Sequence, residues 1–269
     1  MTHAGPVLLA SAPRQLANTD PLVTFPTRGG GAWPVWDRYL AVRGTSLFEI
    51  GNICHTCEFW FRRLGLDADP IDIDAIQQAL TVGIASLDED VVSVFSELLQ
   101  PGDYRVALFS FIPERVEPGS PSDYFVNEQR AVWEYGPIDE VNDPRTDYYR
   151  VTSRFGVSLN SDGDSGFEFL VPLQLPSNLE SAQIGFFTDN LERGARPTAI
   201  AAGVLDIKQH YDSPTAHWCL SHYLLDGHHK VDAAARAGRP VTVLSFINCD
   251  AGISTPDQID QLLGNYGQE

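Results

Sequence analysis

Hydrophobic residues along this chain change their spacing near residue 100. Before it, between residues 70 and 99, apolar side chains recur every three or four positions, which is the period of a helix that buries one face. Beyond it, as far as residue 173, apolar side chains gather in short runs bounded by polar turns, a pattern typical of strands. Helices followed by strands predict a fold of the α+β class.

The individual elements follow from this pattern and from the residues at its ends. Helices are expected over residues 70–84 and 88–99, the second ending before the sequence Pro-Gly-Asp. A short helix is also expected within residues 48–66, and a last one over residues 256–263, with Thr255 as its N-cap. Strands are expected over residues 104–112, 131–135, 147–151 and 167–173.

A strand–turn–helix–strand pattern begins at Tyr223. The apolar run 223–225 leads through the turn D-G-H-H into an alanine-rich helix, and a second apolar run covers residues 241–247. The first N–H groups of a helix lack intrahelical partners and carry partial positive charge, so a phosphate binds there readily. We expect the backbone at Gly227 and the side chains of His228, His229 and Lys230 to contact phosphate, and Asp226 to hold a metal ion or accept a proton.

The same segment, Y-L-L-D-G-H-H-K-V-D-A-A-A at residues 223–235, resembles the ParB/sulfiredoxin-like superfamily in its D-G-H-H-R variant, which is found in free serine kinases. Residues 191–205 look like the helix and strand that precede it, joined through Gly194 and Pro197, so the resemblance covers residues 184–248. Lys230 stands where the relatives usually carry Arg, which keeps a charge but loses the bidentate guanidinium fork.

The resemblance implies an enzyme that uses ATP or another nucleotide with Mg²⁺ and transfers phosphate to a hydroxyl-bearing, amino-acid-like metabolite. It makes Asp226 and His228 catalytic candidates, with Glu192 as the nearest spare acid. Arg193 and Arg196 are candidates for contact with the γ-phosphate or a substrate anion. The alternative is a non-catalytic nucleotide- or metal-responsive protein, in which the same turn binds a ligand and Cys54 and Cys57 hold structural zinc.

These assignments divide the chain into three parts. Residues 1–180 are expected to form a mixed helix and strand region whose role the sequence does not assign. Residues 181–250 are expected to form the ParB/sulfiredoxin-like α/β segment that binds nucleotide, and residues 251–269 a C-terminal helix and tail.

Cys54 and Cys57 form a C-x-x-C pair, which is half of a tetrahedral zinc site. The other half would come from distant residues, and Cys219 and His222 are the candidates we select from the sequence H-W-C-L-S-H. A redox-active C-x-x-C and plain structural thiols are the alternatives. With zinc bound, the pair would be either a structural site or the centre of a zinc-dependent enzyme.

Composition limits the partners. With 269 residues, a formal net charge of −18 and a pI near 4.6, the chain repels a nucleic-acid backbone, although a local basic cluster still suits a small anionic substrate. No apolar run approaches the roughly eighteen residues of a membrane span, and no membrane association is expected. Four cysteines do not make a secreted disulfide framework, so a cytoplasmic location is expected. The oligomeric state stays open.

Overall fold

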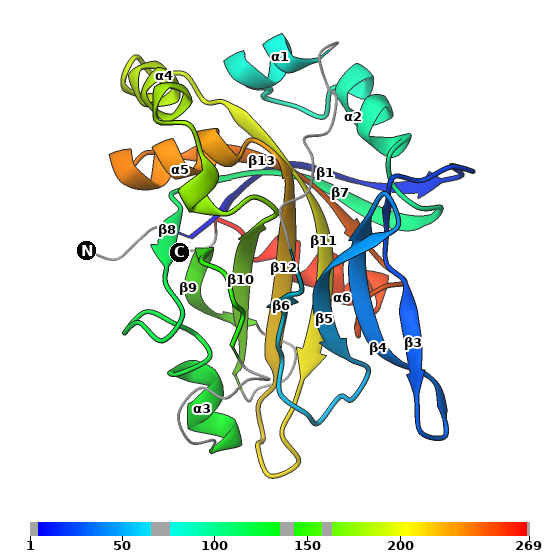
Figure 1. Ribbon diagram of the computed structural model, residues 1–269. Coiled ribbons are helices and arrows are strands. Elements are labelled where there is room, and N and C mark those ends of the chain that lie inside the picture. The colour runs from blue at the N-terminus through cyan, green and yellow to red at the C-terminus, as the bar shows by residue number, and fades with distance from the viewer. Residues whose placement is uncertain (1–4, 66–75, 135–142, 158–162, 268–269) are drawn as a thin grey trace.

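The computed structural model describes residues 5–65, 76–134, 143–157 and 163–267, and these form two β-sheets and six α-helices (Figure 1). The large sheet has eight strands in the order β1 (Val7–Leu16), β7 (Gly102–Phe111), β13 (Val241–Asn248), β11 (Thr198–Lys208), β12 (His217–Asp226), β10 (Asp164–Pro172), β9 (Tyr148–Val157) and β8 (Glu114–Val116). The small sheet comprises β2 (Val23–Thr24), β4 (Trp33–Val42), β5 (Thr45–Asn52) and β6 (Arg62–Arg63), with β3 (Thr27–Gly30) paired to β4. The α+β class predicted from the sequence is confirmed.

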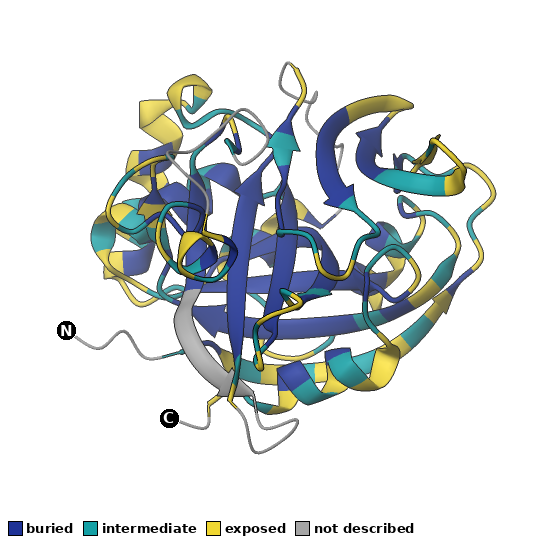
Figure 2. Ribbon diagram, turned by 90° about the horizontal axis from the view of Figure 1, so that it is seen from below, coloured by how far each residue is buried: buried dark blue, intermediate teal, exposed yellow. Residues whose placement is uncertain are grey.

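The large sheet is buried on both faces, and alternation along β12 shows how. Tyr223 and Leu225 join a core shared with the small sheet and with helices α1 (Gln77–Val82) and α2 (Glu89–Ser96). Trp218 and Leu220 point the other way, because successive strand residues face opposite sides. Their core is closed by α4 (Ser181–Glu192), α5 (His228–Ala237) and α6 (Pro256–Gly264). The central strands are accordingly buried along almost their whole length (Figure 2).

Strands β11, β12 and β13 lie in the middle of the large sheet, with β7 on one side and β10 on the other. The segment 181–250, which supplies these three strands, therefore shares one sheet with strands from residues 1–180. Two of the pairings, β10 with β12 and β11 with β13, are parallel, whereas β11 runs antiparallel to β12. The carboxyl ends of β10 and β12 consequently lie next to each other at one edge of the sheet.

The local signals for helix termini are confirmed at two places. The Asp88 carboxylate accepts hydrogen bonds from the backbone N–H groups of Asp90 and Val91 at the start of α2. Thr255 and Gln258 form a reciprocal capping box at the start of α6. Of the helix expected over residues 70–84, the structure has α1 at Gln77–Val82, and the first part of that range lies outside the described residues.

Two sequence predictions are wrong. The strand expected over residues 131–135 is instead helix α3 (Glu128–Trp133), which buries Gln129 and Trp133 at helical spacing. Over the described residues 48–65, the expected short helix is replaced by strands β5 and β6 and by a link without regular secondary structure. Phe59, Trp60 and Phe61 in this link are all buried, and three consecutive buried residues do not fit a helix with one apolar face.

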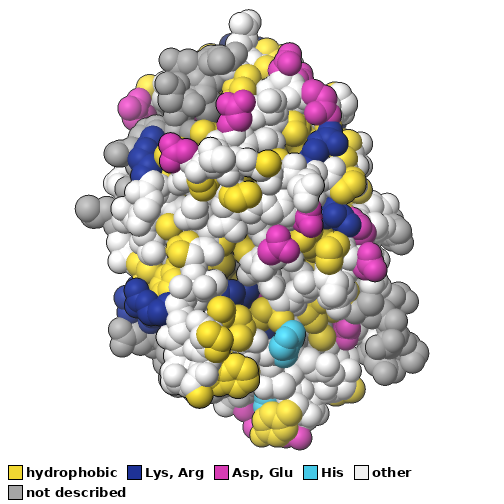
Figure 3. All heavy atoms as spheres, turned by 90° about the vertical axis from the view of Figure 1, so that its right-hand side faces the viewer, with side chains coloured by type: hydrophobic (Ala, Val, Ile, Leu, Met, Phe, Trp, Pro, Cys, Tyr) yellow, Lys and Arg dark blue, Asp and Glu magenta, His cyan; other side chains and the backbone are white. Residues whose placement is uncertain are grey.

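None of the described helices has the length and apolar character needed to cross a membrane. On the face of the molecule seen in Figure 3, acidic and basic side chains are scattered among apolar ones. The acidic side chains therefore do not form a single patch on this face.

Candidate functional site

The sequence D-G-H-H-K forms the predicted junction between strand β12 and helix α5. Gly227 connects the two elements with φ of 95°, a left-handed conformation that favours glycine. A Cβ atom at this position would lie 2.7 Å from the Cβ of Ala199, so the junction also lacks room for a side chain. Glycine is required here for both reasons, and it is the N-cap residue of a helix that has no side-chain cap.

A cavity of about 260 Å³ opens in front of this helix N-terminus. It lies at the sheet edge where β12 ends, beside the loop that follows β10, and it is bounded by α1 and α4. A crevice beyond the carboxyl ends of neighbouring parallel strands is where open α/β sheets usually bind ligands. The residues that line it are Gln77, Thr81, Gln174, Glu180, Gln183, Phe187, Leu225, Asp226, Gly227, His228, His229 and Lys230.

Lys230 is the cation of this cavity. Its ammonium group donates one hydrogen bond to Asp226 Oδ2 at 3.0 Å and another to the backbone oxygen of Thr198 at 3.0 Å. Only 5% of its side chain is exposed, against 26% for Asp226. The pair therefore holds a buried positive charge beside a carboxylate that solvent or a ligand can reach.

The two histidines fix the wall of the cavity. His228 Nε2 accepts hydrogen bonds from the backbone N–H groups of Leu173 and Gln174 at 3.1 and 3.2 Å, and His229 Nε2 accepts one from Glu180 at 3.1 Å. A nitrogen that accepts a hydrogen bond carries no proton, so both rings are neutral. Burial also lowers the pKa of His229 below its ordinary value. These hydrogen bonds hold residues 173, 174 and 180 against the start of α5.

Three of the predicted site residues lie elsewhere. Glu192 belongs to a separate surface hollow between α4 and the end of α5, together with Arg236 and Arg239. Arg193 is exposed, 3.9 Å from Asp189, and Arg196 is exposed and is not among the residues lining the cavity. The structure therefore brings together Asp226, Gly227, His228, His229 and Lys230, without Glu192, Arg193 and Arg196.

Other cavity residues were missed by the sequence analysis. Gln174, Glu180 and Gln183 come from the loop after β10 and the start of α4. These residues follow β10, which neighbours β12, and this position places them beside the cavity. The sequence does not reveal it, because the strand order has to be known first. Gln77 and Thr81 come from α1, which reaches this edge because Ile84 N–H bonds to Thr198 Oγ1 at 3.0 Å. No pattern near residue 77 predicts that contact.

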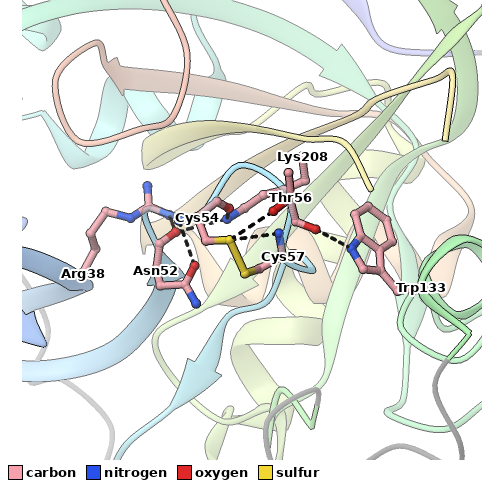
Figure 4. The surroundings of a disulfide bond; sticks show 7 residues. All are labelled: Arg38, Asn52, Cys54, Thr56, Cys57, Trp133 and Lys208. Carbon is pink, nitrogen blue, oxygen red and sulfur yellow. Dashed lines mark hydrogen bonds between the residues drawn. A yellow bond between two sulfur atoms is a disulfide. The ribbon is translucent and has the colours of Figure 1, made fainter. Parts of the chain in front are cut away.

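The four candidate zinc ligands do not converge. Cys54 and Cys57 are joined by a disulfide bond (Figure 4). Cys219 and His222 are both buried but belong to opposite faces of β12, because they are three residues apart on one strand. His222 Nδ1 instead lies 2.8 Å from Ser245 Oγ. In the part of the chain that the structure describes, no three His, Cys, Asp or Glu residues form a group that could hold a metal ion.

Comparison of the chain with protein-family models gives no match, and comparisons with curated proteins and with solved structures give none either.

Proposed function

We propose that the cavity in front of α5 binds the phosphate groups of a nucleotide such as ATP, and that the protein transfers phosphate from it to a hydroxyl-bearing small metabolite. The observation that carries this proposal is the Asp226–Lys230 pair, which stands inside the cavity at the uncapped N-terminus of α5. Phosphoryl transfer needs positive groups that hold phosphate oxygens and a carboxylate that orients the attacking hydroxyl. Lys230 supplies the positive group and Asp226 the carboxylate.

Phosphate binding is supported by the backbone and by one side chain. The first turn of α5 presents N–H groups and the positive end of the helix dipole to the cavity. Gly227 lines the cavity and, with φ of 95°, turns the chain from β12 into this helix N-terminus. Lys230 directs two of its three ammonium protons at protein oxygens, so the third is available to a phosphate oxygen.

The remaining lining suits the sugar and the acceptor. Gln77, Gln174 and Gln183 offer amide donors and acceptors, and Phe187 offers an aromatic face. The volume of about 260 Å³ is somewhat smaller than the range of ligand pockets, which begins at about 300 Å³. Phosphate groups and an adjoining sugar fit within it, and the base of a nucleotide would extend towards solvent.

Asp226 is the group that we assign to the reacting hydroxyl. Its partly exposed carboxylate can accept the proton of an acceptor alcohol as the oxygen attacks phosphorus. Asp226 and Glu180 are both carboxylates of the cavity lining, and oxygen ligands of this kind suit Mg²⁺. A bound Mg²⁺ ion would neutralise charge on the phosphate oxygens. An amino-acid-like alcohol is the acceptor class that the resemblance to free serine kinases suggests.

A second candidate is nucleotide binding without catalysis. It is favoured by the histidines, because both Nε2 atoms are already occupied by backbone N–H groups and cannot act as bases. In this case Asp226 would serve only to hold Lys230 in place.

Binding and turnover separate the two candidates. Isothermal titration of the full chain with ATP and ADP, with and without Mg²⁺, measures the first, and ³¹P NMR with ATP and a panel of amino-acid alcohols measures the second. Binding accompanied by a new phosphate-ester signal supports the kinase, and binding with intact ATP supports the non-catalytic protein. If no nucleotide binds at millimolar concentration, both candidates are excluded.

A matched pair of variants locates the binding site. Lys230→Gln removes the ammonium group at the start of α5 and is expected to weaken ADP binding by about 30-fold, which corresponds to about 2 kcal/mol. Arg236→Gln removes a cation from the last turn of the same helix, outside the cavity, and is expected to leave ADP binding unchanged. Equal effects of the two substitutions would mean that general charge, and not this cavity, attracts the nucleotide.

A further inference from the structure

The second chemical feature of the molecule is the disulfide-bonded loop of Cys54 and Cys57, which is remote in sequence from the cavity and plays no part in the function proposed above. We propose that this disulfide is a reversible redox site, which accepts two electrons from a dithiol and forms again in the folded protein, with Cys54 as the sulfur that is stabilised as a thiolate.

The disulfide is accessible. Cys54 and Cys57 are partly exposed, and the two residues between them, His55 and Thr56, are exposed at the tip of the loop. The free cysteines Cys219 and Cys249 are both buried. A thiol reagent in solution would therefore reach the C-x-x-C loop in the folded chain before it reached either free cysteine.

The loop does not need the disulfide to keep its shape. The Lys208 ammonium donates to the backbone oxygens of Cys54 and Asn52 at 2.6 and 3.1 Å (Figure 4). The Trp133 indole N–H donates to the backbone oxygen of Thr56 at 3.0 Å. The backbone N–H of Gln209 donates to the backbone oxygen of His55 at 2.9 Å. These bonds tie the loop to β11 and α3, so two reduced sulfurs would stay close together and could pair again.

The surroundings of the two sulfurs differ. Cys54 Sγ accepts a hydrogen bond from the backbone N–H of Cys57 at 3.2 Å, and it lies 3.5 Å from the hydroxyl of Thr56. Lys208 adds a positive charge, held on the backbone oxygen of the same Cys54. Hydrogen-bond donors and a nearby cation favour a thiolate over a thiol, so Cys54 is the better leaving group of the pair.

The exchange balances with a dithiol as the reductant. Its thiolate attacks Cys57 Sγ, a mixed disulfide forms, and the bond to Cys54 breaks with Cys54 leaving as a thiolate. The second thiol of the reductant then attacks the reductant's other sulfur, which is bound to Cys57 in the mixed disulfide, and Cys57 is released. Two electrons pass from the dithiol to the protein and the reductant becomes a disulfide. Of the two protons of the dithiol, one protonates Cys57 and the other goes to solvent while Cys54 remains a thiolate.

The first test is reduction of the oxidised full chain by millimolar dithiothreitol at pH 7, followed by alkylation with iodoacetamide and mass spectrometry. We expect Cys54 and Cys57 to be labelled within minutes and Cys219 and Cys249 to stay unlabelled, with the far-ultraviolet circular dichroism unchanged. Oxidised dithiothreitol should then restore the bond. Absence of reduction in the folded state, or loss of the folded structure on reduction, would overturn the proposal.

Single-cysteine variants test the assignment of the thiolate. In Cys57→Ser, the remaining Cys54 is expected to react with iodoacetamide at pH 7 at least 10-fold faster than Cys57 does in Cys54→Ser. In Cys57→Ser, Cys54 should also react faster with 5,5′-dithiobis(2-nitrobenzoate), which forms a mixed disulfide on Cys54 and releases 5-thio-2-nitrobenzoate. Equal rates in the two variants would contradict the role of Cys54. Fluorescence provides an independent readout. Reduction is expected to change the indole fluorescence of Trp133, which donates to Thr56 in this loop, and Trp133→Phe should lack that change.

Discussion

Lys230 Nζ lies 3.0 Å from Asp226 Oδ2, so the last residue of strand β12 is paired with the first turn of helix α5 across the glycine that joins them. The ammonium group also holds the oxygen of Thr198, the first residue of β11. One cation thus fastens two strands and a helix at the edge of the sheet where the cavity opens. The Lys230 ammonium group that stabilises the junction is also the one to which we assign phosphate binding. Substitution of its partner Asp226 therefore tests that assignment.

Asp226→Asn is expected to tighten the binding of inorganic phosphate by about 10-fold while abolishing phosphate transfer. The substitution keeps the shape of the side chain but removes a negative charge that lies beside the ammonium group and would repel phosphate oxygens, and a tenfold change corresponds to about 1.4 kcal/mol. Titration calorimetry measures the affinity, and ³¹P NMR measures the transfer. Asp212→Asn, on an exposed loop outside the cavity lining, is the control and should change neither. Weaker phosphate binding by Asp226→Asn would show that the carboxylate helps to hold the anion.

Gly227→Ala is expected to destabilise the protein by about 3 kcal/mol. Alanine in the left-handed conformation costs roughly 1–2 kcal/mol, and the close approach of Ala199 adds an overpacking cost of similar size. Gly238→Ala is the matched control at the other end of α5, where φ is also positive at 59° but no atom lies within 4 Å of a new Cβ. It should cost about 1 kcal/mol. Urea denaturation of both variants measures the difference, and equal costs would show that crowding at Ala199 does not matter.

The β12–α5 junction could be predicted from the sequence because every signal for it is local. The apolar run, the glycine, the alanine-rich segment and the second apolar run all lie within residues 223–247. The capping residue Thr255 predicted the start of α6 for the same reason. Local patterns failed where tertiary packing decides the backbone, as at the buried aromatic residues 59–61, which pair and stack with residues from β10 and the loop before α3.

The cavity could be predicted only in part, because half of its wall comes from distant segments. Helix α1 reaches it through Gly83, where a Cβ would lie 1.9 Å from the backbone oxygen of Arg196. Such an approach is invisible in a sequence without the fold. The roles of His228 and His229 also could not be predicted from the sequence. A histidine that accepts amide hydrogen bonds and one that donates to phosphate cannot be distinguished by sequence alone. The C-x-x-C spacing likewise leaves zinc, redox and structural roles open, because one pair of thiols fits them all.

His229→Gln is expected to flatten the dependence of stability on pH as the pH falls through the ordinary histidine pKa of 6.5. Burial lowers the pKa of His229 in the folded protein below the ordinary value of 6.5. The unfolded chain therefore binds more protons in this range, and native stability falls as the pH falls through it. Glutamine keeps an acceptor for the N–H of Glu180 and does not titrate. Urea denaturation at several pH values measures the slope, with His55→Gln, an exposed imidazole, as the control that should keep it. An unchanged slope in His229→Gln would contradict the assignment.

Tyr266→Phe is expected to destabilise the protein by about 2 kcal/mol. The Tyr266 hydroxyl donates to Glu168 Oε2 at 2.6 Å, and Glu168 on β10 is completely buried. Removing the hydroxyl leaves that oxygen without its donor, which costs about 1–3 kcal/mol. Exposed Tyr211→Phe is the control and should leave the urea midpoint unchanged.

A double-mutant cycle shows whether this cost belongs to the hydrogen bond. When Glu168→Leu removes the acceptor, Tyr266→Phe should cost less than about 0.5 kcal/mol, because the Tyr266 hydroxyl then has no hydrogen bond to Glu168 to lose. A cost that stays near 2 kcal/mol in the Glu168→Leu background would assign it to packing of the ring against Phe109, whose centroid lies 5.5 Å away. If the coupling is found, the residue beyond α6 anchors the C-terminal segment to the centre of the large sheet. Protease cleavage near the C-terminus should then be faster in Tyr266→Phe than in Tyr211→Phe.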